Sequence, residues 1–395
     1  MSQRRILGLI LAALGITASS AHAQVSELPT TAIGPEVDEY APDTQGPQPT
    51  MFGYAVATAG TVAFATMPAQ DGGKGRVAIF AAGANNTWQR EGTLLPPEGE
   101  TSFGNSIAYA HGVVVVTAAS GAYVYRGANN DWPLLKKIDA PPAVTFGALA
   151  HDAHTLAITA APLGKPSTVD LFEGADFQGP TAITAEDVTV DDAFGYEVAV
   201  AGHTLVIGAP FQQNARGAVY IFRKQKNGWV QSQKLVASEG GANFYFGASV
   251  AIDDKRIVVG APGVPNPNTP AGHKLANQGA VYVFTQQGDT FVREQTLQPT
   301  DEPGEYLNFG TQVRIRGDKI AVTSPVGSTR FQPATCLVYA WDGAQWAPRS
   351  FLFGEYTTGT SLSLSKRAAI LGGPIDSAGG FDIGHGLIAP FSDHP

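Results

Sequence analysis

The sequence predicts an all-β fold, a seven-bladed β-propeller, and three observations lead to that class. The 395 residues are 44% hydrophobic but only 15% charged, and Gly and Pro are plentiful, a balance typical of turn-rich β proteins. The phrase from Phe194 to Phe222 returns almost word for word from Phe246 to Phe284, so the chain contains an internal repeat of about 50 residues. Such a unit is too small to bury its own apolar face and is stable only when it is stacked on its neighbours.

The third observation is the number of repeats and their internal pattern. Phe-Gly or a remnant of it begins units at Phe52, Phe103, Phe146, Phe194, Phe246 and Phe309, and a worn seventh copy lies near Gly359. Each unit reads as four strands. Strand A is Phe-Gly-x-x-Val-Ala-Val, strand B ends on Gly-Ala-Pro, strand C is Gly-Ala-Val-Tyr-Ile-Phe, and strand D follows an aromatic residue. Four-stranded sheets stacked around an axis make a β-propeller, here predicted over residues 52–395.

The first residues have the pattern of a secretory signal peptide. Arg4 and Arg5 precede an apolar run, and Ala21-His22-Ala23 is a small-residue cleavage site. We therefore expect residues 1–23 to be removed and the mature chain to begin near Gln24, in the periplasm or outside the cell. No later apolar run is long enough to span a bilayer.

The segment at 24–51 is predicted to close the ring. The seventh unit ends near Phe391, at the position of strand C, and so lacks a fourth strand. Residues 24–51 lie just ahead of the first Phe-Gly, where a D strand would stand, and closure of this kind removes an exposed sheet edge. The alternative is a disordered N-terminal linker, since the prolines of this segment are tolerated only in an edge strand.

Charge and cysteine content narrow the functional classes. A net charge of -9 argues against a nucleic-acid partner, whose phosphates require a basic footprint. Cys336 is the only cysteine, and its strand-like surroundings predict a buried, unreactive thiol. We expect a monomer.

The repeats resemble the FG-GAP repeats of the integrin α-subunit head and of many secreted bacterial proteins. The resemblance is strongest at residues 194–235 and 246–297 and weaker in the outer units, where Gly-Ala-Pro has become 66–68, 117–119, 160–162 and 372–374. It implies a seven-bladed propeller and a role in adhesion or interaction. Cation-binding members carry an acidic loop between strands A and B, but here that link is a short turn such as Asp253-Asp254-Lys255-Arg256. We therefore expect neither calcium nor another cofactor.

The candidate binding residues lie in the loops from strand D to the next strand A and from strand B to strand C, which should share one face. The D-to-A loops are acidic, and a rim of one charge sign would concentrate cationic ligands; alternatively, these are solvated turns of the repeat. Aromatic side chains near this face, including Phe211, could stack on a sugar ring. His273 lies in the long B-to-C loop at 263–278, which is either a binding loop or a tolerated insertion. The predicted binding residues are Glu186, Asp187, Asp191, Asp192, Phe244, Tyr245, His273, Asp301, Glu305 and Tyr306.

These features favour an exported, non-enzymatic protein that binds a protein or a glycan through one face. The alternative is an extracellular enzyme, a hydrolase or lyase acting on a polysaccharide, with acidic loop residues such as Asp191, Asp192 or Glu305 as acid and base. No linear catalytic motif is present, and we name no catalytic or metal-binding residue. Histidines at the A-to-B turns of consecutive units leave a shared transition metal as a minor alternative.

Overall fold

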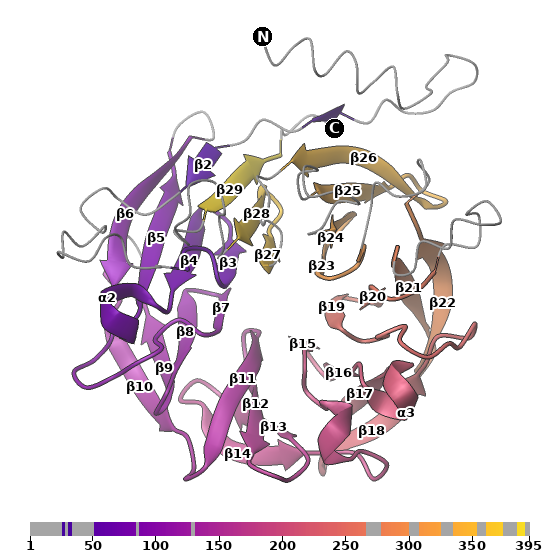
Figure 1. The fold of residues 1–395 in the computed structure, drawn as a ribbon, viewed down its shortest axis with the longest axis horizontal. Helices are drawn as coiled ribbons and strands as arrows, with labels where there is room; N and C mark the ends of the chain where they lie inside the picture. The colour runs from indigo at the N-terminus through magenta and orange to yellow at the C-terminus, as the bar shows by residue number, and fades with distance from the viewer. Residues whose placement is uncertain are drawn as a thin grey trace.

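The computed structural model is a ring of seven four-stranded antiparallel sheets, as the sequence predicts (Figure 1). It describes residues 26–27, 31–33, 51–83, 87–127, 131–265, 278–299, 308–324, 335–353, 361–373 and 385–391. In blades 1 to 6 the four strands follow one another in chain order from the axis to the rim. The innermost strands of neighbouring blades contact one another around the whole ring, including those of the last blade and the first.

The strands have the following bounds. Blades 1 to 3 contain β3 (Val56–Ala59), β4 (Val62–Met67), β5 (Arg76–Ala82), β6 (Trp88–Leu94); β7 (Ile107–Ala110), β8 (Val113–Ala118), β9 (Gly121–Arg126), β10 (Leu134–Asp139); and β11 (Val144–His151), β12 (Thr155–Pro162), β13 (Thr168–Glu173), β14 (Gln178–Ile183). Blades 4 and 5 contain β15 (Val198–Ala201), β16 (Thr204–Ala209), β17 (Ala218–Gln225), β18 (Gly228–Leu235); and β19 (Ser249–Asp253), β20 (Arg256–Ala261), β21 (Ala280–Gln287), β22 (Thr290–Leu297). Blades 6 and 7 contain β23 (Val313–Arg316), β24 (Lys319–Ser324), β25 (Thr335–Trp341), β26 (Trp346–Phe353); and β27 (Ser361–Leu364), β28 (Ala368–Gly373), β29 (His385–Pro390). Short turns α2 (Gln70–Gly73), η3 (Val190–Asp192) and α3 (Gln212–Ala215) lie in loops.

The N-terminal segment supplies the outer strand of blade 7, which confirms the predicted closure. β2 (Thr31–Ile33) pairs antiparallel with β29, with Thr31 opposite Ile388 and Ile33 opposite Gly386. β1 (Ser26–Glu27) was not predicted: it pairs in parallel with β26 at the outer edge of blade 6. The segment that precedes the first blade therefore joins the last two blades.

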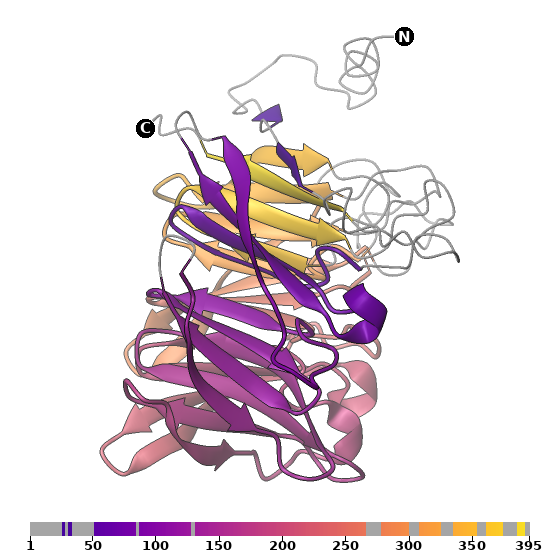
Figure 2. The same ribbon diagram turned by 90° about the vertical axis from the view of Figure 1, so that its left-hand side faces the viewer.

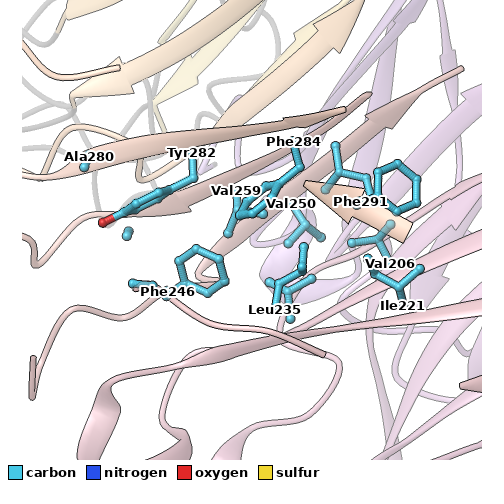
Figure 3. Close-up of a cluster of buried hydrophobic side chains, with 14 of the residues drawn as sticks. Val206, Ile221, Leu235, Phe246, Val250, Val259, Ala280, Tyr282, Phe284 and Phe291 are labelled. Atoms are coloured by element: carbon cyan, nitrogen blue, oxygen red, sulfur yellow. The ribbon is translucent and has the colours of Figure 1, made fainter. Parts of the chain in front are cut away.

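The Phe of each strong Phe-Gly is core, packed at the junction of two blades. Phe246 is fully buried, and its ring meets the Tyr282 ring edge-on, with centroids 5.3 Å apart. The same cluster includes Val206 and Leu235 from blade 4, so each blade face is covered by its neighbour (Figure 3). Burial of a Phe or Leu side chain contributes about 1.5–3 kcal/mol, which explains why the repeat keeps this position apolar. Cys336 is also fully buried, as predicted, and burial raises the pKa of its thiol to about 12.

In five blades strand A begins after Phe-Gly and not, as the sequence predicts, at it, whereas in blade 3 the strand β11 includes Phe146 and Gly147. In blade 4 strand A begins at Val198, and Phe194 stands in the turn before it. The reason is Gly195, whose φ of +84° breaks the extended conformation while its N–H donates to the carbonyl of Gly208 at 2.9 Å. In blade 4, Phe-Gly is therefore a bend that leads the chain from the rim to the axis.

Gly208, the glycine of Gly-Ala-Pro in blade 4, lies against the next blade. A Cβ placed on Gly208 would overlap the carbonyl oxygen of Gly247, the glycine of the Phe-Gly of blade 5. The equivalent residue of blade 3 is Thr159, whose hydroxyl donates to the Gly195 carbonyl at 2.6 Å. In blades 3 and 4 this position of the repeat is thus a contact with the next blade, made by a hydrogen-bonding threonine in one and by a glycine in the other.

Candidate functional site

The D-to-A loops and the B-to-C loops share one face of the ring, as predicted. Figure 2 shows the turns α2 and α3, indigo and pink, on the same side of the molecule. In blade 4 the two loop types contact each other directly, because the N–H of Phe211 donates to the Asp192 carbonyl at 3.4 Å. On the other side of α3, the N–H of Tyr245 donates to the Ala215 carbonyl at 2.9 Å. We call this side the loop face.

Asp187 is part of a hydrogen-bonded network within blade 4. Its carboxylate accepts a hydrogen bond from the Tyr220 hydroxyl at 2.9 Å and pairs with Lys234 Nζ at 2.5 Å. Burial alone would raise the pKa of Asp187, but the bonds from Lys234 and Tyr220 outweigh it and hold the pKa below its usual range. The negative charge of Asp187 is therefore matched by the positive charge of Lys234 on strand D.

The same network recurs in other blades. In blade 2 the carboxylate of Glu100 accepts the Tyr123 hydroxyl at 2.6 Å, and in blade 5 Glu239 lies 3.5 Å from the Tyr282 hydroxyl and pairs with Arg293. Tyr220 and Tyr282 each end a Gly-Ala-Val-Tyr sequence at the start of strand C. Tyr123 takes the same place in the variant Ser-Gly-Ala-Tyr. A loop acid that holds the repeat tyrosine is a structural element, which favours the interpretation of these loops as part of the repeat over a rim of unpaired charge.

The remaining described carboxylates are of two kinds. Asp192 caps the turn η3, because its side chain accepts the Thr189 N–H at 2.6 Å and the Thr189 hydroxyl at 2.9 Å. Glu186 and Asp191 are exposed. His273, Asp301, Glu305 and Tyr306 lie outside the residues that the structure describes.

An exposed group of aromatic rings occupies the loop face of blade 4. The Phe211 ring meets the Tyr196 ring edge-on at 6.1 Å and the Tyr245 ring edge-on at 5.8 Å, with interplanar angles of 88° and 82°. Tyr196 is 52% exposed and Phe211 43% exposed. Phe244 is half-buried and packs against the core between blades 4 and 5. The structure thus brings together two of the aromatic residues singled out in the sequence and adds Tyr196.

The rings extend toward the axis of the propeller. Burial raises the pKa of Tyr196, and the negative charges of Glu197 and Tyr54 raise it further. Both tyrosines directly follow a Phe-Gly, at the inner end of their blades. This residue after Phe-Gly is the sequence signal that could have identified them. We call Tyr196, Phe211 and Tyr245 the aromatic patch.

An ion pair crosses the axis beside the aromatic patch. Glu197 of blade 4 lies 3.1 Å from Arg314 of blade 6, with blade 5 between them. Burial raises the pKa of Glu197, and Arg314 opposes that rise. The carboxylate and the guanidinium form an ion pair near the axis, and this ion pair links two blades that are not neighbours in the ring.

The turn α3 beside Phe211 has an unusual backbone. Gln213, Asn214 and Ala215 have φ values of +52°, +60° and +59°, so three successive residues with a Cβ adopt the left-handed conformation. Each costs about 1–2 kcal/mol in isolation, and such strain persists where surrounding contacts fix it, commonly at functional sites. Here the carbonyls of Asn214 and Ala215 accept hydrogen bonds from Asn243 and Tyr245.

On the opposite face, the A-to-B turns are tied to one another. The side chain of Asp152 in blade 3 accepts the N–H of Gly202 in blade 4 at 2.7 Å. Asp253 in blade 5 likewise accepts the N–H of Gly317 in blade 6 and pairs with Arg316 at 3.5 Å. Among the described residues, no group of three or more His, Cys, Asp or Glu side chains is arranged to hold a metal ion.

His151, at the end of β11 on this face, predicts a pH dependence. Burial lowers the pKa of its imidazole to about 4, against about 6.5 in the unfolded chain. Between pH 4 and pH 6.5 the unfolded state therefore binds more protons than the folded state. The contribution of His151 to the free energy of unfolding is fully present above pH 6.5 and falls by up to about 3 kcal/mol as the pH drops toward 4. Unfolding by urea across this range should show the decline in wild type and a smaller one in His151→Gln. His154→Gln, which retains His151, should keep the full decline; equal slopes in all three proteins would contradict the assignment.

Comparisons with known proteins agree with this architecture. The model of the FG-GAP repeat family matches residues 181–222 and 229–284, from the end of β14 to β21. A chain in a crystal structure of the mitotic checkpoint complex is 12% identical over 96% of this chain and 99% of that chain, with a TM-score of 0.57. The WD40 domain of Pan2 from Neurospora crassa is 12% identical over 94% and 98% of the two chains, with a TM-score of 0.56. At such identities the likeness shows the fold alone.

A search of curated proteins returned no significant match. No helix in the described part of the chain has the length and apolar character needed to cross a membrane.

Proposed function

Because the chain is a seven-bladed β-propeller with FG-GAP repeats, we propose that it is an exported, non-enzymatic binding protein that recognises a protein or glycan ligand through its loop face. The aromatic patch is the observation that carries this proposal. Large aromatic side chains are normally buried, and a group of them left in solvent on a rigid scaffold is typical of a recognition surface. Export rests on the signal-peptide pattern of residues 1–23.

The positions of the carboxylates support binding over catalysis. A glycoside hydrolase needs two carboxyl groups at a defined separation, one of them free to donate a proton. Asp187 is paired with Lys234, and Asp192 caps its own turn, so these two are committed to structure. We therefore prefer a surface that binds without cleaving.

The test is a binding screen of the mature protein, from Gln24, against arrayed glycans, soluble polysaccharides and envelope proteins, with product analysis of every polymer that binds. Binding without new reducing ends or unsaturated products supports the proposal. Cleavage of a bound polymer would replace it with the enzymatic alternative, and failure to bind any glycan or protein would overturn it.

We also propose that the fold needs no calcium. In the A-to-B turns, where related propellers hold cations, the carboxylates of Asp152 and Asp253 here accept hydrogen bonds from backbone N–H groups of the next blade. A bound ion would stabilise the folded state by mass action, by about 3 kcal/mol when its concentration is 100 times its Kd. The Tm measured in excess EDTA should equal the Tm measured with added calcium. A fall in Tm on chelation, reversed by calcium, would show a cation site.

A further inference from the structure

We propose that the aromatic patch is a carbohydrate-binding site that stacks the apolar face of a pyranose ring on Phe211 or on Tyr196. This inference rests on the proposed binding function and names the class of ligand. Its first support is concentration: of the three aromatic side chains that are exposed in the described residues, two, Tyr196 and Phe211, belong to the patch, and the third is Tyr54 of blade 1. The other described aromatic side chains are buried or partly buried.

The geometry of the rings suits a sugar. Phe211 stands nearly perpendicular to both Tyr196 and Tyr245, at 88° and 82°. A pyranose has an apolar C–H face and an edge of hydroxyl groups, so one ring can stack on its face while a perpendicular ring contacts its edge. The tyrosine hydroxyls add hydrogen-bonding groups at the ends of the flanking rings.

The polar border of the patch suits the hydroxyl groups of such a ligand. Asp191, Gln213 and Asn214 are exposed on the two loops that flank Phe211. Carboxylate and amide groups are planar and can bond two adjacent hydroxyls at once. No ion pair of Asp191 is found among the described residues, in contrast to Asp187, which is paired with Lys234.

The site is also held in place before a ligand arrives. Phe211 is tied to η3 through the Asp192 carbonyl, and Tyr245 is tied to α3 through the Ala215 carbonyl. The left-handed residues Gln213 and Asn214 set the two amide side chains on a strained turn. Binding by a rigid site costs little conformational entropy, which matters for ligands as small as a few sugar rings.

A protein partner fits these observations less well. A standard protein interface buries about 800 Å² on each partner around a largely apolar centre. Here the exposed aromatic surface consists of a few rings, and polar side chains lie directly beside them. An amphipathic ligand of that size, with alternating C–H faces and hydroxyl edges, is an oligosaccharide.

The experiment uses the mature chain and a panel of hexasaccharides, those of cellulose, xylan, mannan, chitin, laminarin and dextran, at concentrations up to about 1 mM. We expect at least one to bind, with saturation-transfer NMR signals strongest on the ring C–H protons. Phe211→Ala and Tyr196→Leu should each weaken binding about tenfold or more, because leucine keeps apolar area but offers no ring to stack on. Val230→Ala, at an exposed apolar residue of the outer strand β18, is the matched control and should bind as wild type.

The outcomes separate this inference from the proposed function. Binding that survives Phe211→Ala and Tyr196→Leu, in proteins with unchanged melting curves, would place the glycan site elsewhere and overturn the inference alone. No binding of any hexasaccharide, with capture of an envelope protein that these variants abolish, would also overturn it while leaving the binding function standing. Cleavage of a hexasaccharide would instead overturn the non-enzymatic function.

Discussion

Gly208→Ala is expected to destabilise the propeller by about 3 kcal/mol, at the upper end of what an added methyl group costs in a packed core. The new Cβ would meet the backbone carbonyl of Gly247 in the next blade, and a backbone atom cannot turn aside as a flexible side chain can. The two blades would have to move apart, which loosens the Phe246 cluster between them. The measurement is the midpoint of urea unfolding together with Tm.

Gly147→Ala is the matched control for this effect. Gly147 is the glycine of Phe-Gly in blade 3, but there it lies within strand β11, and the nearest atom to an added Cβ belongs to the Thr159 side chain at 3.6 Å. Alanine should be accepted there with a change of less than about 1 kcal/mol, since a strand does not need the freedom of glycine. Equal losses in the two variants would show that the blade contact at Gly208 has no special role.

The number of blades and their order could be predicted from the sequence because the residues that recur in each repeat have structural roles. The Phe of Phe-Gly fills the junction between blades, and Gly-Ala-Pro ends a strand where two backbones approach each other. The worn units were harder to align, since Thr159 rather than Ala160 takes the place of Gly208. Thr159 fills that place by donating a hydrogen bond to a carbonyl of the next blade, and such a contact is not visible in one sequence.

The site was predictable only in part, for a similar reason. Phe211 and Tyr245 stood out as aromatic residues in loops, but their contact depends on the left-handed turn of Gln213 to Ala215, a conformation that these residue types do not favour. Asp187 looked like a ligand because composition does not show that Tyr220 and Lys234 meet its carboxylate. The sequence does not single out Tyr196, because the residue after Phe-Gly reads as part of strand A, whereas in the structure it precedes β15 at the inner end of the blade.

Removing β2 should cost the ring its closure and lower Tm by about 4 °C, which corresponds to roughly 3 kcal/mol for a domain of this size. β2 is the outer strand of blade 7, and without it β29 presents unpaired backbone groups from Gly386 to Ile388 at a sheet edge. The innermost strand of this blade, β27, contacts β3 of blade 1, so disorder in blade 7 opens the ring at its seam. An open edge also invites pairing with another chain, and we expect concentration-dependent association in light scattering.

A graded series of truncations separates the two N-terminal strands. A chain that begins at Leu28 lacks β1 but keeps β2, and a chain that begins at Gly34 lacks both. The large loss should come only at the second step, because β1 adds two residues in parallel to a blade that already has four strands, whereas β2 is the fourth strand of its blade. A synthetic peptide of residues 24–35 added to the chain that begins at Gly34 should raise Tm with increasing peptide concentration, as binding to the folded state requires. If the chain that begins at Gly34 melts like the mature protein, the pairing of β2 with β29 contributes nothing to stability and closure must rest on the contact between β27 and β3.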